Sequence, residues 1–197
     1  MTKWIKGITL VCILALALSG CLFDTRDADP PADEGDDVIP LDDPLGVFQA
    51  MTVALESKKD ANYERAISER FVFSPTQPDS LDQTFAGTTV YDNWNKTVEM
   101  DVLGLLLADA QSIDVEFNPT PQGGSTTTFQ RFRVVYELRV VNRATPNDTT
   151  VYAGVANFDH RLEGGNWRLT FWDEIDTVPD RSTWGYLKGI LRLQLNP

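Results

Sequence analysis

The chain has 197 residues and a formal net charge of −12, with 42% of its residues hydrophobic and 23% charged. This excess of acids argues against binding to nucleic acid or to anionic membrane surfaces, both of which attract clustered lysine and arginine. The two cysteines, Cys12 and Cys21, lie near the amino terminus, so the rest of the chain can hold no disulfide, thiolate zinc site or cysteine nucleophile.

Residues 1–20 have the features of a secretory signal peptide. Lys3 and Lys6 precede the mostly apolar run ITLVCILALAL, and the small residues Ser19 and Gly20 end the segment. The run is shorter than the roughly 20 apolar residues that cross a bilayer. We therefore expect residues 1–20 to be removed and no transmembrane helix to remain in the mature chain.

The four residues LSGC at positions 18–21 resemble the lipobox of bacterial lipoproteins. The resemblance implies that Cys21 becomes the acylated first residue and anchors the protein in a membrane of the bacterial cell envelope. Because each buried methylene contributes about 0.8 kcal/mol, several acyl chains would hold firmly. By the same resemblance, Leu22 in place of an aspartate favours the outer membrane over the inner one. The alternative is an ordinary signal peptide followed by an incidental cysteine.

Residues 21–43 are predicted to form an acidic, disordered tether behind the lipidated cysteine. Between residues 22 and 43 there are nine acids, one base and the prolines Pro30, Pro31 and Pro40. Such a segment repels itself and buries too little apolar surface to offset the entropy of ordering. A calcium-binding or partner-binding acidic patch is the alternative, although no calcium-loop spacing is present.

Residues 44–197 suit a single domain with a sizeable core. Asp43 as a cap and Pro44 at the first helical position predict the start of a helix. Its apolar positions recur every four residues: Val47, Met51 and Leu55. The domain therefore opens with an amphipathic helix.

A second, shorter helix is predicted from Asp60, with Tyr63 and Ile67 on its buried side. The segment RFVFS that follows indicates a strand, because Phe71 and Phe73 alternate onto one face.

A polar loop over residues 75–89 leads to a third predicted helix within YDNWNKTVEMDVLGLLLADA. Asp92 or Asn93 is expected to cap this helix, and Glu99 is expected to be a surface charge. The apolar positions at helical spacing are Val98, Val102, Leu105 and Leu106.

Alternating strands follow, as expected for half-buried antiparallel pairs. The first covers residues 112–118, and the second, QRFRVVYELRV, has its inner face at Phe132, Val134, Tyr136, Leu138 and Val140. A hairpin turning at Gly164 and Gly165 is predicted within VYAGVANFDHRLEGGNWRLTFWDEI. A final helix in DRSTWGYLKGILR is expected to be capped by Ser182.

This order of elements resembles the nuclear transport factor 2-like superfamily over residues 44 to about 176. The segments that carry the resemblance are ALESKKDANYERAISERFVFS and GGNWRLTFWDE. It implies an α+β fold in which N-terminal helices pack on a curved antiparallel sheet to make a cone. The superfamily includes isomerases, dehydratases, cargo binders and association modules, so the resemblance fixes no function.

The predicted hairpin register places His160, the single histidine, opposite Leu169 on an apolar face, and Phe158 opposite Phe171. Asp173 falls on the same face but roughly 13 Å further along, which is too far for a hydrogen bond with His160. His160 is either a hydrogen-bonded, partly buried structural residue or an acid–base group. Asp173 either ends the strand or acts as an inward base of the kind that the resemblance implies. Trp172 is predicted on the opposite face, at a dimer interface or under the final helix.

Aromatic residues dominate the predicted inner face. The candidates for lining a ligand pocket are Tyr136, Phe158, Trp94 and Trp167, and the alternative is that they are core residues. No glycine-rich phosphate loop, paired metal-ligand histidines or serine elbow is present, so no cofactor or metal is expected.

We therefore expect a lipid-anchored envelope protein that binds a small apolar ligand in the cone, or an envelope protein across the sheet, without catalysis. A homodimer through the sheet is a further alternative. The competing class is an isomerase-like or dehydratase-like enzyme that uses Asp173 or His160.

Overall fold

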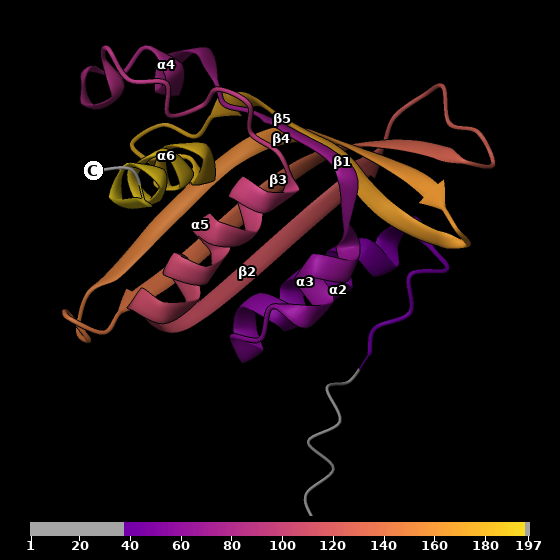
Figure 1. Cartoon of the computed structure of the whole chain (residues 1–197), viewed down its shortest axis with the longest axis horizontal. Helices are drawn as coiled ribbons and strands as arrows, with labels where there is room; N and C mark the ends of the chain where they lie inside the picture. The colour runs from indigo at the N-terminus through magenta and orange to yellow at the C-terminus, as the bar shows by residue number, and fades with distance from the viewer. Residues whose placement is uncertain (1–37, 196–197) are drawn as a thin grey trace, which may run out of the picture. The chain divides into compact units, whose positions relative to one another are not determined.

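The computed structural model of the chain describes residues 38–195 (Figure 1). The predicted signal peptide, Cys21 and most of the predicted tether lie outside these residues. Within residues 38–195, no helix combines the length and the apolar character that a bilayer crossing requires.

Five strands form one curved sheet in the order β1-β5-β4-β3-β2. Their bounds are Ile67–Ser74 for β1, Ala110–Pro121 for β2, Phe129–Asn142 for β3, Thr149–Glu163 for β4 and Asn166–Thr177 for β5. Strands β2 to β5 form an antiparallel meander, whereas β1 pairs with β5 in parallel. The sequence predicted the antiparallel part and not the parallel edge.

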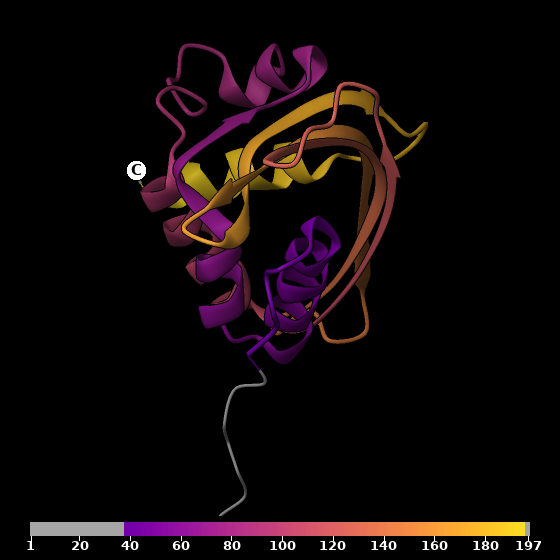
Figure 2. The same cartoon turned by 90° about the vertical axis from the view of Figure 1, so that its right-hand side faces the viewer.

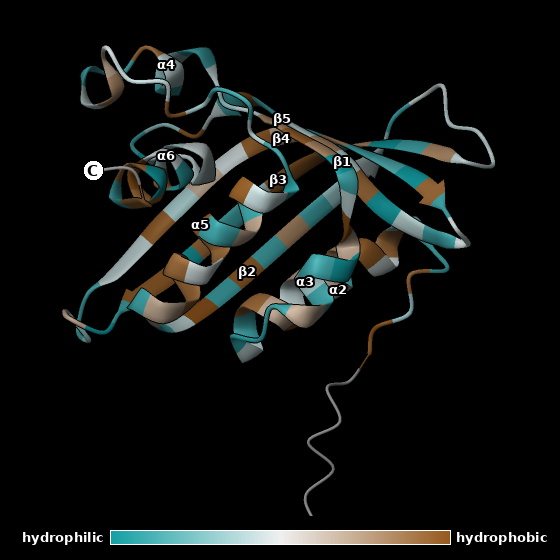
Figure 3. Cartoon of the chain, in the orientation of Figure 1, coloured by the Kyte–Doolittle hydropathy of each residue, from teal (hydrophilic) through white to brown (hydrophobic). Residues whose placement is uncertain are grey.

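The longer helices lie on the concave side of this sheet, which wraps around α2 (Figure 2). Their bounds are Pro44–Ser57 for α2, Ala61–Ala66 for α3, Lys96–Asp109 for α5 and Trp184–Leu195 for α6. The loop between β1 and α5 contains the short helix α4, Gln77–Ser80, and a 3₁₀ turn at Gln83–Phe85. Brown, apolar residues alternate with teal, hydrophilic ones along strands such as β2 (Figure 3). The predicted α+β class, with helices on a curved sheet, is confirmed.

Helix α2 begins as the sequence predicts. The Asp43 carboxylate accepts a hydrogen bond from the Leu45 amide at 2.7 Å, and Pro44 occupies the first helical position. The helix ends where Lys58 adopts the left-handed conformation, with a φ of 56°.

Replacing Asp43 with alanine is expected to lower the free energy of unfolding by about 1 kcal/mol, because the first amides of α2 lose their acceptor. Urea unfolding of the variant measures the change. Asp42→Ala removes the adjacent exposed carboxylate and serves as the control. An equal loss in both variants would assign the effect to charge and not to capping.

The folded domain begins before residue 44, which corrects the predicted boundary of the tether. Ile39 and Leu41 are buried, with Leu41 only 2% exposed. The Trp167 amide donates to the Leu41 carbonyl at 2.6 Å, and the Ile39 amide donates to the Asn62 side chain at 3.3 Å. The acids around this short apolar segment obscured its alternation of exposed and buried residues.

Two predicted helix caps are also corrected. Helix α5 is capped by Asn95, whose side chain accepts from the Val98 amide at 3.1 Å, and not by Asp92 or Asn93. Helix α6 follows Thr183, whose hydroxyl accepts from the Tyr186 amide at 2.9 Å. Ser182 instead extends the sheet, since its carbonyl accepts from the amide of Ala153 at 2.9 Å. In each case an equally suitable polar residue lies nearer to the helix.

A bulge in β5 reverses the faces that the sequence predicted for the end of this strand. Gly164 and Gly165 form the turn with φ angles of 59° and 86°, and His160 pairs with Leu169 as expected. The register then shifts, so that Phe158 pairs with Trp172 and not with Phe171.

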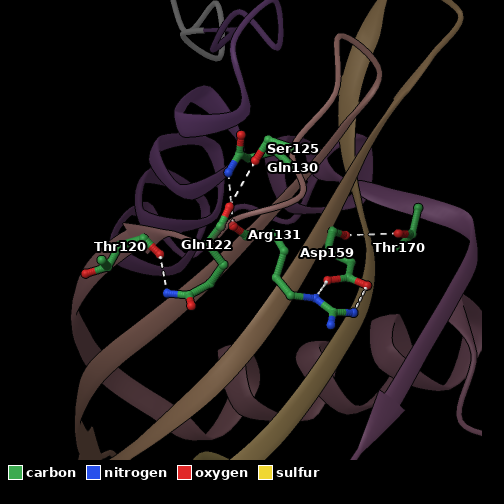
Figure 4. Close-up of polar contacts among 7 residues, drawn as sticks. All are labelled: Thr120, Gln122, Ser125, Gln130, Arg131, Asp159 and Thr170. Carbon is green, nitrogen blue, oxygen red and sulfur yellow. Dashed lines mark hydrogen bonds and ion pairs between the residues drawn. The ribbon is translucent and has the colours of Figure 1, made fainter.

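Thr170 occupies the bulge, and its hydroxyl donates to the Asp159 carbonyl at 2.9 Å (Figure 4). Arg131 makes a two-point ion pair with the Asp159 carboxylate beside it, at 2.5 and 2.6 Å. Beyond the bulge Trp172 and Glu174 are buried, while Asp173 is only partly covered. The prediction of an inward Asp173 is therefore wrong, because one extra residue inverts the alternation of a strand.

Candidate functional site

A buried ion pair joins α5 to α6 inside the cone. The Lys188 ammonium lies 2.8 Å from Glu99 Oε1 and 3.0 Å from Oε2, and both residues are at most 2% exposed. Glu99 was predicted to be a surface charge, which is wrong. The pair fixes the two helices to one another, because a single unpaired charge at this depth would be strongly unfavourable.

Both partners of this pair have further contacts. The Tyr63 hydroxyl donates to Glu99 Oε1 at 2.7 Å, and the Trp94 indole donates to Oε2 at 2.8 Å. The Lys188 ammonium lies 3.5 Å from the centroid of a Trp172 ring and 4.3 Å from that of Phe73. Burial lowers the pKa of Lys188, and the neighbouring Glu99 carboxylate opposes that shift. Aromatic faces and a fully hydrogen-bonded carboxylate thus replace the water that both charges lose.

Glu174, on the inward face of β5 after the bulge, is a second buried carboxylate. Tyr136 donates its hydroxyl hydrogen to this group, at 2.9 Å from either carboxylate oxygen. The Gly185 amide donates to Glu174 Oε1 at 3.1 Å, and the Trp184 amide donates to the Tyr136 oxygen at 3.0 Å. The sheet therefore supplies acceptors to the first amides of α6.

The pKa of Glu174 is raised to about 7 by burial, against the opposing effects of the Tyr136 hydrogen bond and the Lys188 charge. A carboxyl group with this pKa exchanges a proton near neutral pH. Glu174 thus has the property expected of an inward base at Asp173, one residue further along the strand.

Glu174 is expected to make the domain less stable as pH rises from about 4.5, its ordinary pKa, to about 7. A raised folded-state pKa means that the folded protein keeps a proton which the unfolded chain has released. The stabilising contribution of the Glu174 proton is complete below pH 4.5 and is lost as pH rises through 7. At about 1.4 kcal/mol per pKa unit, the total loss is about 3 kcal/mol.

Glu174→Gln cannot titrate, so in urea unfolding its stability should rise relative to that of the wild type as pH increases from 4.5 to 7. Glu116→Gln, at an exposed position of β2, is the matched control. The same pH slope in wild type and Glu174→Gln would contradict the assignment.

His160 lies in an aromatic box within the cone and is fully buried. Its ring centroid is 5.0 Å from that of Phe48, 5.4 Å from that of Phe132 and 6.4 Å from that of Phe158. Neither ring nitrogen has a hydrogen-bond partner among residues 38–195. Burial lowers the pKa of His160 to about 3. The predicted apolar face is confirmed, whereas the predicted hydrogen bond is wrong.

The four aromatic residues proposed from the sequence as pocket residues are all buried: Tyr136, Phe158, Trp94 and Trp167. Tyr136 and Trp94 donate to buried carboxylates, and the Phe158 ring packs 4.6 Å from Trp172. Trp172 itself is fully buried and contacts Trp184 of α6 at 4.7 Å. A dimer interface at Trp172 is therefore contradicted, and its position under the final helix is confirmed.

Two open pockets of about 520 Å³ each lie at the surface of the domain. One is lined by Gly87, Thr88, Thr89, Val90, Arg192 and Leu193. The other is lined by Glu69, Arg70, Thr128, Arg161, Leu162, Glu163 and Gly164. In the described part of the chain, no three histidine, cysteine or acidic residues are grouped so that they could hold a metal ion.

Solved structures resemble this fold, although their sequences are very different. No protein-family model and no curated protein matches the chain. A proposed aromatic ring hydroxylase from Novosphingobium aromaticivorans is 14% identical with a TM-score of 0.54, over 71% of this chain and 92% of the other. A proposed scytalone dehydratase from the same species is 10% identical with a TM-score of 0.53, over 67% and 80%.

A nuclear transport factor 2-like superfamily protein from Salmonella enterica is 7% identical with a TM-score of 0.51, over 68% of this chain and 88% of its own. At these identities the likeness shows the fold alone. The cone-like fold expected from the sequence is thereby confirmed, and this fold accommodates both ligand-binding proteins and enzymes.

Proposed function

We propose that this protein is a lipid-anchored binding protein of a bacterial cell envelope that has no catalytic activity of its own. In this proposal Cys21 carries the anchor, and the domain that begins near residue 38 binds a small molecule. The support for the anchor comes from the sequence LSGC.

One observation carries the choice of binding over catalysis. The two buried glutamates are bound to the final helix: Glu99 pairs with Lys188, and Glu174 accepts from the Gly185 amide. His160 is enclosed by aromatic rings and is fully buried. A catalytic acid or base must reach the proton that it transfers. Here both carboxylates hold α6 against α5 and the sheet, which is a structural role.

Side chains pack together inside the cone, so we place the proposed binding site at the surface. Trp172, Trp184, Phe158 and Tyr136 contact one another where the apolar ligand was expected. The two pockets of about 520 Å³ lie on the outside, and their volume is in the range of small-molecule sites.

An enzyme of the isomerase or dehydratase type is the second candidate, and Glu174 is the observation that favours it. Its pKa of about 7 suits a general acid or base, and Tyr136 is a hydrogen-bond donor beside it. This mechanism requires α6 to move away from the sheet so that a substrate can reach Glu174.

Mass spectrometry of the full-length protein, produced in a Gram-negative host and extracted from its membranes, tests the proposal. We expect a mature chain that begins at an acylated Cys21 and a copurifying small molecule in native spectra. Cys21→Ser should leave the protein unacylated. An unmodified Cys21 in the wild type would contradict the anchor, and turnover of a copurified compound that Glu174→Gln abolishes would contradict the noncatalytic role.

A further inference from the structure

We propose that the pocket at the carboxyl-terminal end of α6 binds the carboxylate or phosphate group of a small organic anion through Arg192. The proposal rests on the binding function above and names the ligand class. The pocket forms where residues 87–90, in the loop before α5, meet Arg192 and Leu193. Figure 1 shows this last part of α6 close to the loop that carries α4.

The Arg192 guanidinium is held in place and yet retains a free donor. Its central carbon lies 5.0 Å from the centroid of a Trp94 ring, which orients the planar group. The Nη1 atom is buried and has no hydrogen-bond partner among residues 38–195. A buried donor without an acceptor is costly. Because Arg192 lines the pocket, a ligand oxygen that reaches Nη1 after a small shift of the guanidinium would satisfy this donor.

The charge around Arg192 differs from that around two arginines on the sheet that form ion pairs. Arg131 is paired with Asp159, and Arg139 is paired with Asp114 and Glu137. None of the six residues that line the Arg192 pocket is acidic. Asp92 contributes a favourable field that opposes the lowering of the Arg192 pKa by burial, but the described residues contain no ion pair between the two. The pocket therefore presents a positive charge with no acidic residue in its lining.

The loop that closes the pocket is held in shape by its own hydrogen bonds. The Thr88 amide and hydroxyl both donate to the Phe85 carbonyl, at 3.0 and 2.7 Å, and the Asp92 amide donates to the Thr89 carbonyl at 2.9 Å. The loop side of the site is thus formed without its ligand, which lowers the entropic cost of binding.

The residues of the pocket indicate the kind of anion. A guanidinium recognises carboxylate and phosphate oxygens through two parallel hydrogen bonds. Val90 and Leu193 add apolar surface, and a volume of about 520 Å³ exceeds what a lone inorganic ion fills. A small organic acid or phosphate ester, with an apolar body beside its charged group, satisfies both parts of the site.

Two-dimensional amide and arginine side-chain NMR of the full chain in detergent tests this proposal, with benzoate, its uncharged analogue benzamide and inorganic phosphate as probes. We expect benzoate to shift the signals of Gly87, Thr89 and the Arg192 side chain, and benzamide to bind at least tenfold more weakly. A stronger response to phosphate than to benzoate would assign the site to phosphate esters, and the reverse would assign it to organic acids.

Arg192→Met keeps the aliphatic stem near Trp94 and removes the charge, so it should weaken benzoate binding at least tenfold. Arg133→Met, at an exposed position of β3, is the matched control and should leave binding unchanged. Signals of the distant sheet report whether each variant is folded.

Any of three results would overturn the proposal: no shifts near Arg192 with any probe, equal binding of benzoate and benzamide, or equal benzoate affinity in wild type and Arg192→Met. A copurified ligand that remains bound to Arg192→Met would overturn this site while leaving the general binding function intact. The two proposals can therefore fail separately.

Discussion

Lys188→Met is expected to lower the free energy of unfolding by about 3–5 kcal/mol, the usual cost of removing one partner from a buried ion pair. The methionine fills a similar volume, but Glu99 keeps its negative charge with only the Tyr63 and Trp94 donors to compensate it. The Trp172 and Phe73 rings also lose the cation that lies against them. Urea unfolding at neutral pH measures the loss.

A double variant separates the charge from the packing. In Lys188→Met with Glu99→Gln no unpaired charge remains, so most of the lost stability should return. Lys96→Met is the matched control, because Lys96 pairs at 2.7 Å with the exposed Glu69. Its cost should not exceed about 1 kcal/mol. Equal costs for the Lys188 and Lys96 variants would show that the buried pair is not needed for stability.

Acid is expected to destabilise the domain through His160 as pH falls from 6.5, its ordinary pKa, towards 3, its folded-state pKa. A lowered folded-state pKa means that the unfolded chain takes up a proton which the folded protein excludes. The stabilising contribution of neutral His160 is complete above pH 6.5 and is lost as pH falls towards 3. At about 1.4 kcal/mol per pKa unit, the total loss is up to about 5 kcal/mol. His160→Leu, which cannot titrate and fits the aromatic box, should lack this loss.

Glu174 makes the His160 effect harder to see in the wild type. Between about pH 4.5 and 6.5 the two groups act in opposite directions, because acid favours folding at Glu174 and opposes it at His160. Unfolding should therefore be compared across this range in wild type, His160→Leu, Glu174→Gln and the double variant. His160→Leu should become more stable with acid and Glu174→Gln less stable. Parallel pH profiles for all four proteins would rule out both assignments.

The sequence contained enough information for most of the fold. Alternation predicted the inner face of β3, and the paired glycines predicted the turn between β4 and β5. These features depend on residues close together in the chain. The bulge at Thr170 depends instead on how β5 fits its two neighbours, and no local pattern around Thr170 distinguishes it from a regular strand.

The candidate sites were less predictable for a related reason. Lys188 lies at helical spacing from the buried Trp184 and Leu191, so its place on an apolar stripe was a readable signal. Its partner Glu99 belongs to another helix, and one sequence does not show which helices touch. Arg192 gave no signal at all, because its pocket is created by a distant loop.

The strand order also determines when this protein can finish folding. Strand β1 is made early in the chain, but its neighbour in the sheet is β5, the last strand to be synthesised. Helix α6, which supplies the lysine of the buried ion pair, follows later still. Such long-range pairing is associated with slow folding. A nascent chain of this topology therefore cannot complete its sheet until β5 has been made, and it cannot form the buried ion pair until α6 follows.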